Sequence, residues 1–179
     1  MVTSLQFEEL LRLYDDYEIN EQLNIYYDTT DRKIQALRAG MRIRYKNNKY
    51  IFTLKIKHHD DHIELEKEIP HDNINEIQHD ETIAAWLKEY DLEGPFVEIG
   101  RVHTLRYIHR TDDAEICFDK NHYNGITDYE IEYEFLQDHD GLKCFNELLA
   151  HVHVTFKKNC ISKIGRMVNT LCHLIFMYF

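Results

Sequence analysis

Residues 41–68 read MRIRYKNNKYIFTLKIKHHDDHIELEKE and carry the clearest structural signal in the chain. Polar and apolar residues alternate along almost all of this stretch, which is the period-two pattern of β-strands with one buried face. The pair Asn47-Asn48 interrupts the alternation and is typical of a tight hairpin turn. A second polar turn is expected at residues 59–61, so the stretch predicts three consecutive antiparallel strands.

Similar patterns extend outward on both sides, with Gly94-Pro95 as a strong break between two strand-rich halves. The other predicted strands cover residues 23–28, 96–109, 114–119 and 129–135. One-sided apolar spacing predicts helices or helical turns over residues 5–14, 32–39, 83–90, 142–152 and 162–174. We therefore expect an α+β fold with about seven strands.

Composition limits the possible functions. The chain has 179 residues and a formal net charge of −11, which suits one domain over residues 1–179 with a real core. The negative charge argues against a general binder of nucleic acid duplexes, because such binders neutralise phosphates with many cations. A basic site inside an acidic shell stays compatible with this charge.

The cysteines and the two ends of the sequence bear on where in the cell the protein is expected. The four cysteines have no C-x-x-C spacing, so we expect reduced, structural thiols at Cys117, Cys144, Cys160 and Cys172. The N-terminus is acidic and amphipathic, so no signal peptide is predicted. The apolar C-terminal residues 171–179 are too few to span a bilayer. These observations predict a cytoplasmic protein with no membrane partner.

The order of the charges along the predicted strands needs an explanation. Consecutive strands are nearly uniform in sign: Arg42 and Arg44, then Lys55 and Lys57, then Glu64, Glu66 and Glu68, and later Arg106, Asp119 and Glu130, Glu132 and Glu134. Like charges two residues apart on one strand face repel, so something must compensate them. Adjacent basic and acidic strands could do so, and so could a solvated polar face. A barrel with its polar face turned inward around a polyanion is the third interpretation.

The third interpretation assigns chemistry to each kind of strand. Arginine offers forked hydrogen bonds to phosphate oxygens, and lysine offers a compact point charge. Carboxylates are the ligands that Mg²⁺ and Mn²⁺ prefer. The pattern thus favours a phosphate side and a metal side within one site.

Eight short segments occur in the order in which a known family carries them. They are Tyr26-Tyr27-Asp28-Thr29, Leu37-Arg38-Ala39-Gly40-Met41-Arg42-Ile43-Arg44, Thr53-Leu54-Lys55, Glu64-Leu65-Glu66, Thr104-Leu105-Arg106, Cys117-Phe118-Asp119, Asp128-Tyr129-Glu130-Ile131-Glu132-Tyr133-Glu134 and Ser162-Lys163-Ile164. Together they resemble the CYTH superfamily, also called the triphosphate tunnel metalloenzymes, and most closely its members in low-GC Gram-positive bacteria. No single segment is specific, but the ordered set is.

The resemblance implies an eight-stranded antiparallel, tunnel-type β-barrel with outer helices. It implies cleavage or rearrangement of a triphosphate, such as tripolyphosphate or a nucleoside or thiamine triphosphate, with Mg²⁺ or Mn²⁺ and without a covalent intermediate. The phosphate-binding residues would be Arg42, Arg44, Lys55, Lys57, Arg106 and Lys163. The catalytic residues would be Glu64 and Lys55, and the metal ligands would be Glu130, Glu132, Glu66 and Asp119.

The chain departs from the family at its first strand, where members carry the signature E-x-E-x-K. Here Met1 leads almost directly into a helix, and Glu8-Glu9 has the wrong spacing. Three alternatives follow: a start upstream of Met1, a non-catalytic relative, or a strand supplied by a second copy in a homodimer. The functional alternatives are accordingly a metal-dependent triphosphate hydrolase and a non-catalytic protein that binds a polyphosphate or nucleotide.

Overall fold

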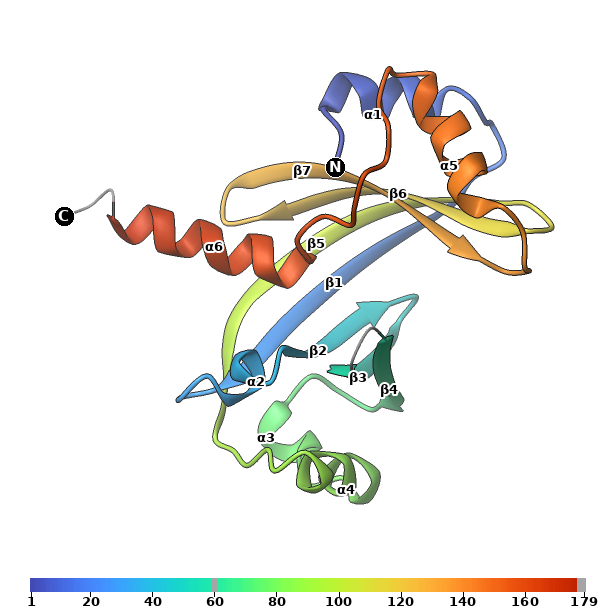
Figure 1. Cartoon of the computed structure of the whole chain (residues 1–179). Helices are drawn as coiled ribbons and strands as arrows, with labels where there is room; N and C mark the ends of the chain where they lie inside the picture. Colours follow the sequence, from blue (N-terminus) through green and yellow to red (C-terminus); the bar gives the residue numbers. More distant parts are fainter. Residues whose placement is uncertain (59–60, 177–179) are drawn as a thin grey trace. The chain divides into compact units, whose positions relative to one another are not determined.

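The computed structural model describes residues 1–58 and 61–176, and Figure 1 shows the order of their helices and strands. Side chains are described except at residues 58, 61–62 and 171–176. Residues 59 and 60 of the second predicted turn, and the last three residues of the apolar C-terminal segment, lie outside the described residues.

The described strands form one sheet of seven, in the order β4-β3-β2-β1-β5-β6-β7. The strands are β1 (Glu18–Thr29), β2 (Ala39–Lys46), β3 (Lys49–His58), β4 (Asp61–Ile69), β5 (Phe96–Arg110), β6 (Ala114–Tyr123) and β7 (Ile126–Phe135). The helices are α1 (Ser4–Leu11), α2 (Lys33–Ala36), α3 (Ile74–Ile77), α4 (Glu81–Glu89), α5 (Gly141–Ala150) and α6 (Lys163–Phe176). The predicted number of strands is confirmed, and it is one fewer than the eight of the expected barrel.

The predicted strands differ from those of the structure mainly in where they begin and end. The strand predicted to begin at residue 23 begins at Glu18, and the strand predicted to end at Asp119 continues to Tyr123. The extra residues are largely polar, so hydrophobic alternation gave no signal there. The hairpin turn is confirmed at Asn47 and Asn48, with φ angles of 51° and 60°. These angles match the right-handed twist of the flanking strands, and asparagine tolerates them.

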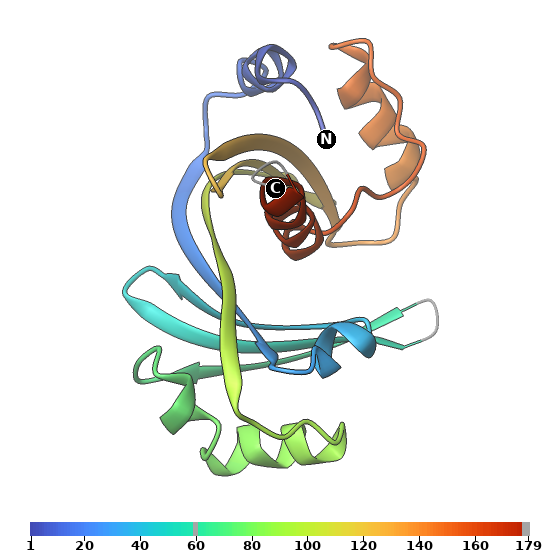
Figure 2. The ribbon, with the colours of Figure 1, turned by 90° about the vertical axis from the view of Figure 1, so that its left-hand side faces the viewer.

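The chain comprises two compact units, which we describe separately. The first consists of Met1–Glu21 with His103–Lys163. In it α1 and α5 both pack on β7, and Figure 2 shows the two helices on the same face of the strands. Their core is formed by Phe7, Leu10, Ile116, Phe118, Ile131, Leu148, Leu149 and Val152. The opposite face of β6 and β7 therefore carries the alternate, polar residues.

The second unit consists of Gln22–Val102 with Ile164–Phe179, as far as the latter are described. Its β2, β3 and β4 are paired antiparallel, with Met41 opposite Leu54 and Leu54 opposite Leu65. One face of these strands packs on α3 and α4, which Figure 2 shows together on one side. The core includes Ile25, Ile43, Phe52, Leu54, Ile77, Ile83 and Leu87. Arg42, Thr53, Lys55, Glu64 and Glu66 of the same strands occupy the other face.

The outer side of β7 meets the beginning of the chain. The amide of Val2 donates a hydrogen bond to the carbonyl oxygen of Tyr129 at 3.1 Å, and the two residues form an isolated antiparallel bridge. Thr3 caps α1 directly afterwards, with a capping box that includes Gln6. The segment before α1 therefore approaches β7 as a strand would, over a single bridge.

Asp28, in the segment Tyr26-Tyr27-Asp28-Thr29, is the hydrogen-bond acceptor for the turn that leads from β1 to α2. Its carboxylate is buried, and Oδ1 accepts hydrogen bonds from the amides of Thr29 at 2.8 Å and Ile34 at 3.0 Å. Oδ2 accepts a third from the amide of Gln35 at 3.3 Å. The side chain thus satisfies amides at the start of α2, which has no side-chain cap at Arg32.

We predict that Asp28→Ala lowers the free energy of unfolding by about 2–3 kcal/mol, because amides of the first turn of α2 would lose their acceptor in a buried position. Urea denaturation followed by circular dichroism measures the change. Asp15→Ala, which removes an exposed carboxylate, is the control and should leave stability unchanged. Equal stability of the two variants would contradict the structural role of Asp28.

Candidate functional site

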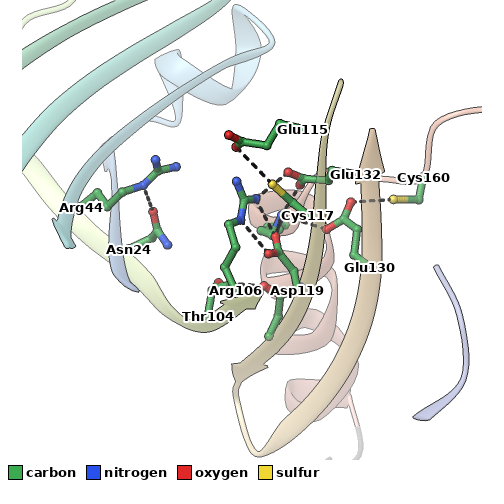
Figure 3. A network of polar contacts seen from close by, with 12 residues as sticks. Asn24, Arg44, Thr104, Arg106, Glu115, Cys117, Asp119, Glu130, Glu132 and Cys160 are labelled. Atoms are coloured by element: carbon green, nitrogen blue, oxygen red, sulfur yellow. Dashed lines mark hydrogen bonds and ion pairs between the residues drawn. The ribbon is translucent and has the colours of Figure 1, made fainter. Parts of the chain in front are cut away.

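A row of charged residues crosses the last three strands of the sheet. Arg106 of β5 is the register partner of Asp119 of β6, and Asp119 is the partner of Glu130 of β7. Cross-strand partners project from the same face, so the three side chains are neighbours. Glu132 lies two residues further along β7 on that face, and Figure 3 shows its carboxylate beside Arg106.

Two cations bind the carboxylates of this row. The Arg106 guanidinium makes a forked pair with Asp119, in which Nε and Nη2 each lie 2.7 Å from a carboxylate oxygen. Its Nη2 also lies 2.5 Å from Glu132 Oε2. The ammonium of Lys163, the first residue of α6, lies 2.9 Å from Asp119 Oδ2 and 3.0 Å from Glu130 Oε2, and it also pairs with Glu132. We call these five residues the acidic cluster.

The acidic cluster is largely withdrawn from solvent. The Asp119 side chain is 0% exposed, and those of Arg106 and Lys163 are each 14% exposed. Burial by itself lowers the pKa of both cations, but Asp119, Glu132 and, for Lys163, Glu130 raise it by more, so both pKa values lie above their usual ranges. Both cations are therefore charged at neutral pH. Three carboxyl groups thus share two cations.

The same carboxylates have the chemistry of a divalent-cation site. Asp119, Glu130 and Glu132 each offer an oxygen, and these oxygens lie within 4.8 Å of one another. Such hard oxygen donors suit Mg²⁺ or Mn²⁺. The position among them already holds a cationic group, the Lys163 ammonium. The residues present thus fit a cation.

A second group of potential ligands in the described residues consists of Cys117, Glu132 and Glu134. The Cys117 thiol is buried, and burial raises its pKa well above the usual range, so the sulfur keeps its proton. A protonated thiol is a poor metal ligand. The all-carboxylate group is chemically the better candidate for Mg²⁺ or Mn²⁺.

In the second unit, β2, β3 and β4 share one charged face, and the side chains on it form ion pairs with one another. Arg42 is the register partner of Thr53, and Thr53 is the partner of Glu66. Arg42 Nη2 lies 3.5 Å from Glu64 Oε1 and 3.7 Å from Glu66 Oε1. The Thr53 hydroxyl donates to Glu66 at 2.7 Å, and the ammonium of Lys55 lies 3.0 Å from Glu64 Oε2.

Glu64 is held as a carboxylate by these neighbours. Burial raises its pKa, but the hydrogen bond from Lys55 and the charges of Lys55, Arg42 and Arg44 outweigh burial and lower the pKa below its usual value. A carboxylate with a lowered pKa is a weak proton acceptor. Glu64 is thus better suited to orienting a cation or a water molecule than to removing a proton.

The remaining predicted cations have different surroundings. Arg44 donates from Nε to the side-chain oxygen of Asn24 at 3.0 Å, and Asn24 is buried. Lys57 lies two residues beyond Lys55 on β3 and is exposed. The structure therefore brings Arg106, Asp119, Glu130, Glu132 and Lys163 into one cluster. It brings Arg42, Lys55, Glu64 and Glu66 into another.

Two polar neighbours of the acidic cluster, Asn121 and Cys160, were not predicted from the sequence. Asn121 accepts a hydrogen bond from Thr104 at 2.7 Å and donates one to Asp128 at 3.0 Å, which extends the polar row beside Asp119. The Cys160 thiol donates to Glu130 at 3.0 Å (Figure 3). Alternation along β6 could have placed Asn121 on this face. No periodic signal could have placed Cys160, which lies in an irregular segment.

Comparisons with known proteins identify the family and the fold of the chain. A family model described as the CYTH domain matches residues 4–159. The protein named "Putative triphosphatase YjbK" from Bacillus subtilis is 26% identical over 167 residues, which cover 86% of this chain and 84% of that protein. In the part of the chain that the structure describes, every helix is too short or too polar to cross a membrane.

Two solved structures show the same fold. The structure of a putative adenylate cyclase from Bacillus halodurans has a TM-score of 0.75 and 24% identity, with 93% of this chain and 92% of that one covered. That of HpAC1 from Hippeastrum, a putative adenylyl cyclase with a dominant triphosphatase activity, has a TM-score of 0.74 and 18% identity, with 95% and 92% covered. Because the family model spans most of the chain, the resemblance seen in the ordered motifs is confirmed, and the chain belongs to the CYTH domain family.

Proposed function

We propose that this protein binds a triphosphate and hydrolyses it in a reaction that depends on Mg²⁺ or Mn²⁺. The acidic cluster carries the proposal, because it combines three convergent carboxylates and an arginine on one polar sheet face with a lysine from the start of α6. The names of two CYTH relatives support it, since one is called a triphosphatase and the other has a dominant triphosphatase activity.

In this proposal Asp119, Glu130 and Glu132 hold the divalent cation, which would neutralise phosphate charge and activate water. Arg106 orients Asp119 and Glu132 through its fork and offers its charge to a phosphate oxygen. In the second unit, Arg42, Arg44, Lys55 and Lys57 offer phosphate contacts. There Glu64 orients the ammonium of Lys55. The assignment of Glu66 as a metal ligand stays a prediction.

The second candidate is a binding protein without catalysis. It is favoured by the pairing of all three carboxylates of the acidic cluster with Lys163, which leaves less charge for a metal. A binding protein would be stabilised by triphosphate through mass action but would not release phosphate.

The deciding experiment incubates the purified protein with tripolyphosphate or ATP, and with Mg²⁺ or Mn²⁺, and measures released phosphate. Melting temperature is measured in the same solutions. We expect both a rise in melting temperature and release of phosphate that EDTA abolishes. A rise without release would leave the binding protein as the function, and neither effect would reject both candidates.

We predict that Arg42→Ala weakens triphosphate binding about tenfold, because it removes a charge-assisted hydrogen bond to a phosphate. Isothermal titration calorimetry with tripolyphosphate measures the affinity. Arg12→Ala removes the same charge at an exposed position after α1 and is the matched control. Equal affinities of the two variants would exclude Arg42 from the phosphate side.

A further inference from the structure

Lys163 lies among the three carboxylates that the proposed function assigns to the divalent cation. Its ammonium contacts one oxygen of each of Asp119, Glu130 and Glu132. These are the same three residues whose oxygens converge within 4.8 Å. Lys163 therefore acts as a counter-ion to the whole group and not to a single partner.

We propose that Lys163 is a tethered competitor of the divalent cation, so that the ammonium leaves the carboxylates when the metal binds. The inference rests on the proposed function, because it takes the three carboxylates as the metal ligands. A lysine charge and a divalent cation cannot share a desolvated position of this size without strong repulsion. Arg106 differs, since its fork engages Asp119 and Glu132 but not Glu130.

The local structure permits Lys163 to move. Residues 154–162, which precede it, contain no helix or strand, and Lys163 itself is the first residue of α6. Movement of the Lys163 side chain alone breaks no ladder hydrogen bond of the sheet, and it leaves the preceding segment anchored through Phe156 and Cys160. The three carboxylates project from β6 and β7, which are paired along their length.

The displacement has a consequence for the substrate. An ammonium released from the carboxylates is available to a phosphate oxygen at the same site. Binding of the metal should therefore raise the affinity for triphosphate beyond the direct contribution of the metal. Lys163 thus has two alternative partners: the carboxylates when no metal is bound, and a phosphate oxygen when the metal is bound.

The test compares Mn²⁺ affinities by isothermal titration calorimetry for wild type, Lys163→Met and Lys163→Gln, without triphosphate. We expect both variants to bind Mn²⁺ about tenfold more tightly or better, because the competing charge is gone. Lys158→Met removes one exposed charge from the same irregular segment and should bind as wild type does. Adding Glu132→Gln to Lys163→Met should abolish most of the gain.

A second measurement uses the wild-type protein and needs no stable variant. The reactivity of lysine amines toward an acetylating reagent is followed by mass spectrometry with and without Mn²⁺. Lys163 should be protected without the metal and several-fold more reactive with it, while Lys158 should not change.

Unchanged Mn²⁺ affinity in Lys163→Met and Lys163→Gln, or persistent protection of Lys163, would overturn the competition. If the wild-type protein still hydrolyses triphosphate when either of these results is found, the proposed function stands and only the competition between Lys163 and the metal is rejected. If no variant binds Mn²⁺ and no phosphate is released, the proposed hydrolysis fails as well.

Discussion

Arg106→Ala should lower the free energy of unfolding by about 3–5 kcal/mol, because it leaves a buried carboxylate without its forked partner. Asp119 is fully buried, and Arg106 supplies two of its hydrogen bonds. Lys163 would remain as a partner of Asp119, which favours the lower end of that range. Urea denaturation at pH 7, followed by circular dichroism, gives the free energy of unfolding.

The chain offers a matched control for this prediction. Arg101 makes the same forked pair with Glu98, with Nε and Nη2 at 2.7 and 2.9 Å, but its side chain is 55% exposed. Solvent weakens exposed ion pairs, so Arg101→Ala should cost about 1 kcal/mol or less. If the two substitutions lowered the free energy of unfolding equally, the acidic cluster would be as solvated as the Arg101–Glu98 pair, which would contradict its burial in the structure.

The side chains on each strand carry charges of nearly uniform sign, and the register of the strands explains this pattern. Arg106 stands opposite Asp119, and Lys55 stands opposite Glu64. Basic and acidic strands thus compensate each other where they are neighbours, as one of the sequence interpretations held. Only the register can show this, because a shift by one residue would turn every charge to the other face. The pairing does not exclude phosphate binding, since ligand binding can exchange these partners.

Strands and their polar faces could be predicted from residues alone, since alternation is a local property. The family resemblance, and not alternation, grouped Asp119, Glu130 and Glu132 with Glu66 as metal ligands, and the first three lie in one group. The sequence did not indicate which carboxylate is central. Asp119 was one of four candidate metal ligands, and it is the fully buried one; like Glu132, it pairs with both cations.

Contacts that depend on irregular segments could not be predicted. Lys163 was expected to point toward the site, but its three carboxylate partners follow from the path of residues 154–162. Cys160 reaches Glu130 from the same segment. Asp28 was read as part of a motif, while its role as acceptor for the α2 amides depends on the turn after β1. Loops of this kind have no periodic pattern of polar and apolar residues, so the sequence alone does not indicate where their side chains point.

The largest effect on activity is expected for Glu130→Gln. The substitution keeps size and shape but removes one of the three charges that would hold the divalent cation, so metal-dependent phosphate release should fall about 100-fold or more. Affinity for tripolyphosphate without metal should change little, because no cation of the acidic cluster is lost. Phosphate release is measured over a series of Mn²⁺ concentrations, and calorimetry gives the affinity.

Glu147→Gln is the control, because it removes an exposed carboxylate of α5 whose nearest ion pair, with Lys143, spans 3.9 Å. It should leave both phosphate release and affinity unchanged. A gain of activity for Glu130→Gln at saturating Mn²⁺ would mean that its loss came from weaker metal affinity, which is the expected mechanism. Activity equal to that of Glu147→Gln at every Mn²⁺ concentration would instead remove Glu130 from the metal side. The carboxylates of the cluster would then serve to hold Arg106 and Lys163 in place, as the ion pairs alone would allow.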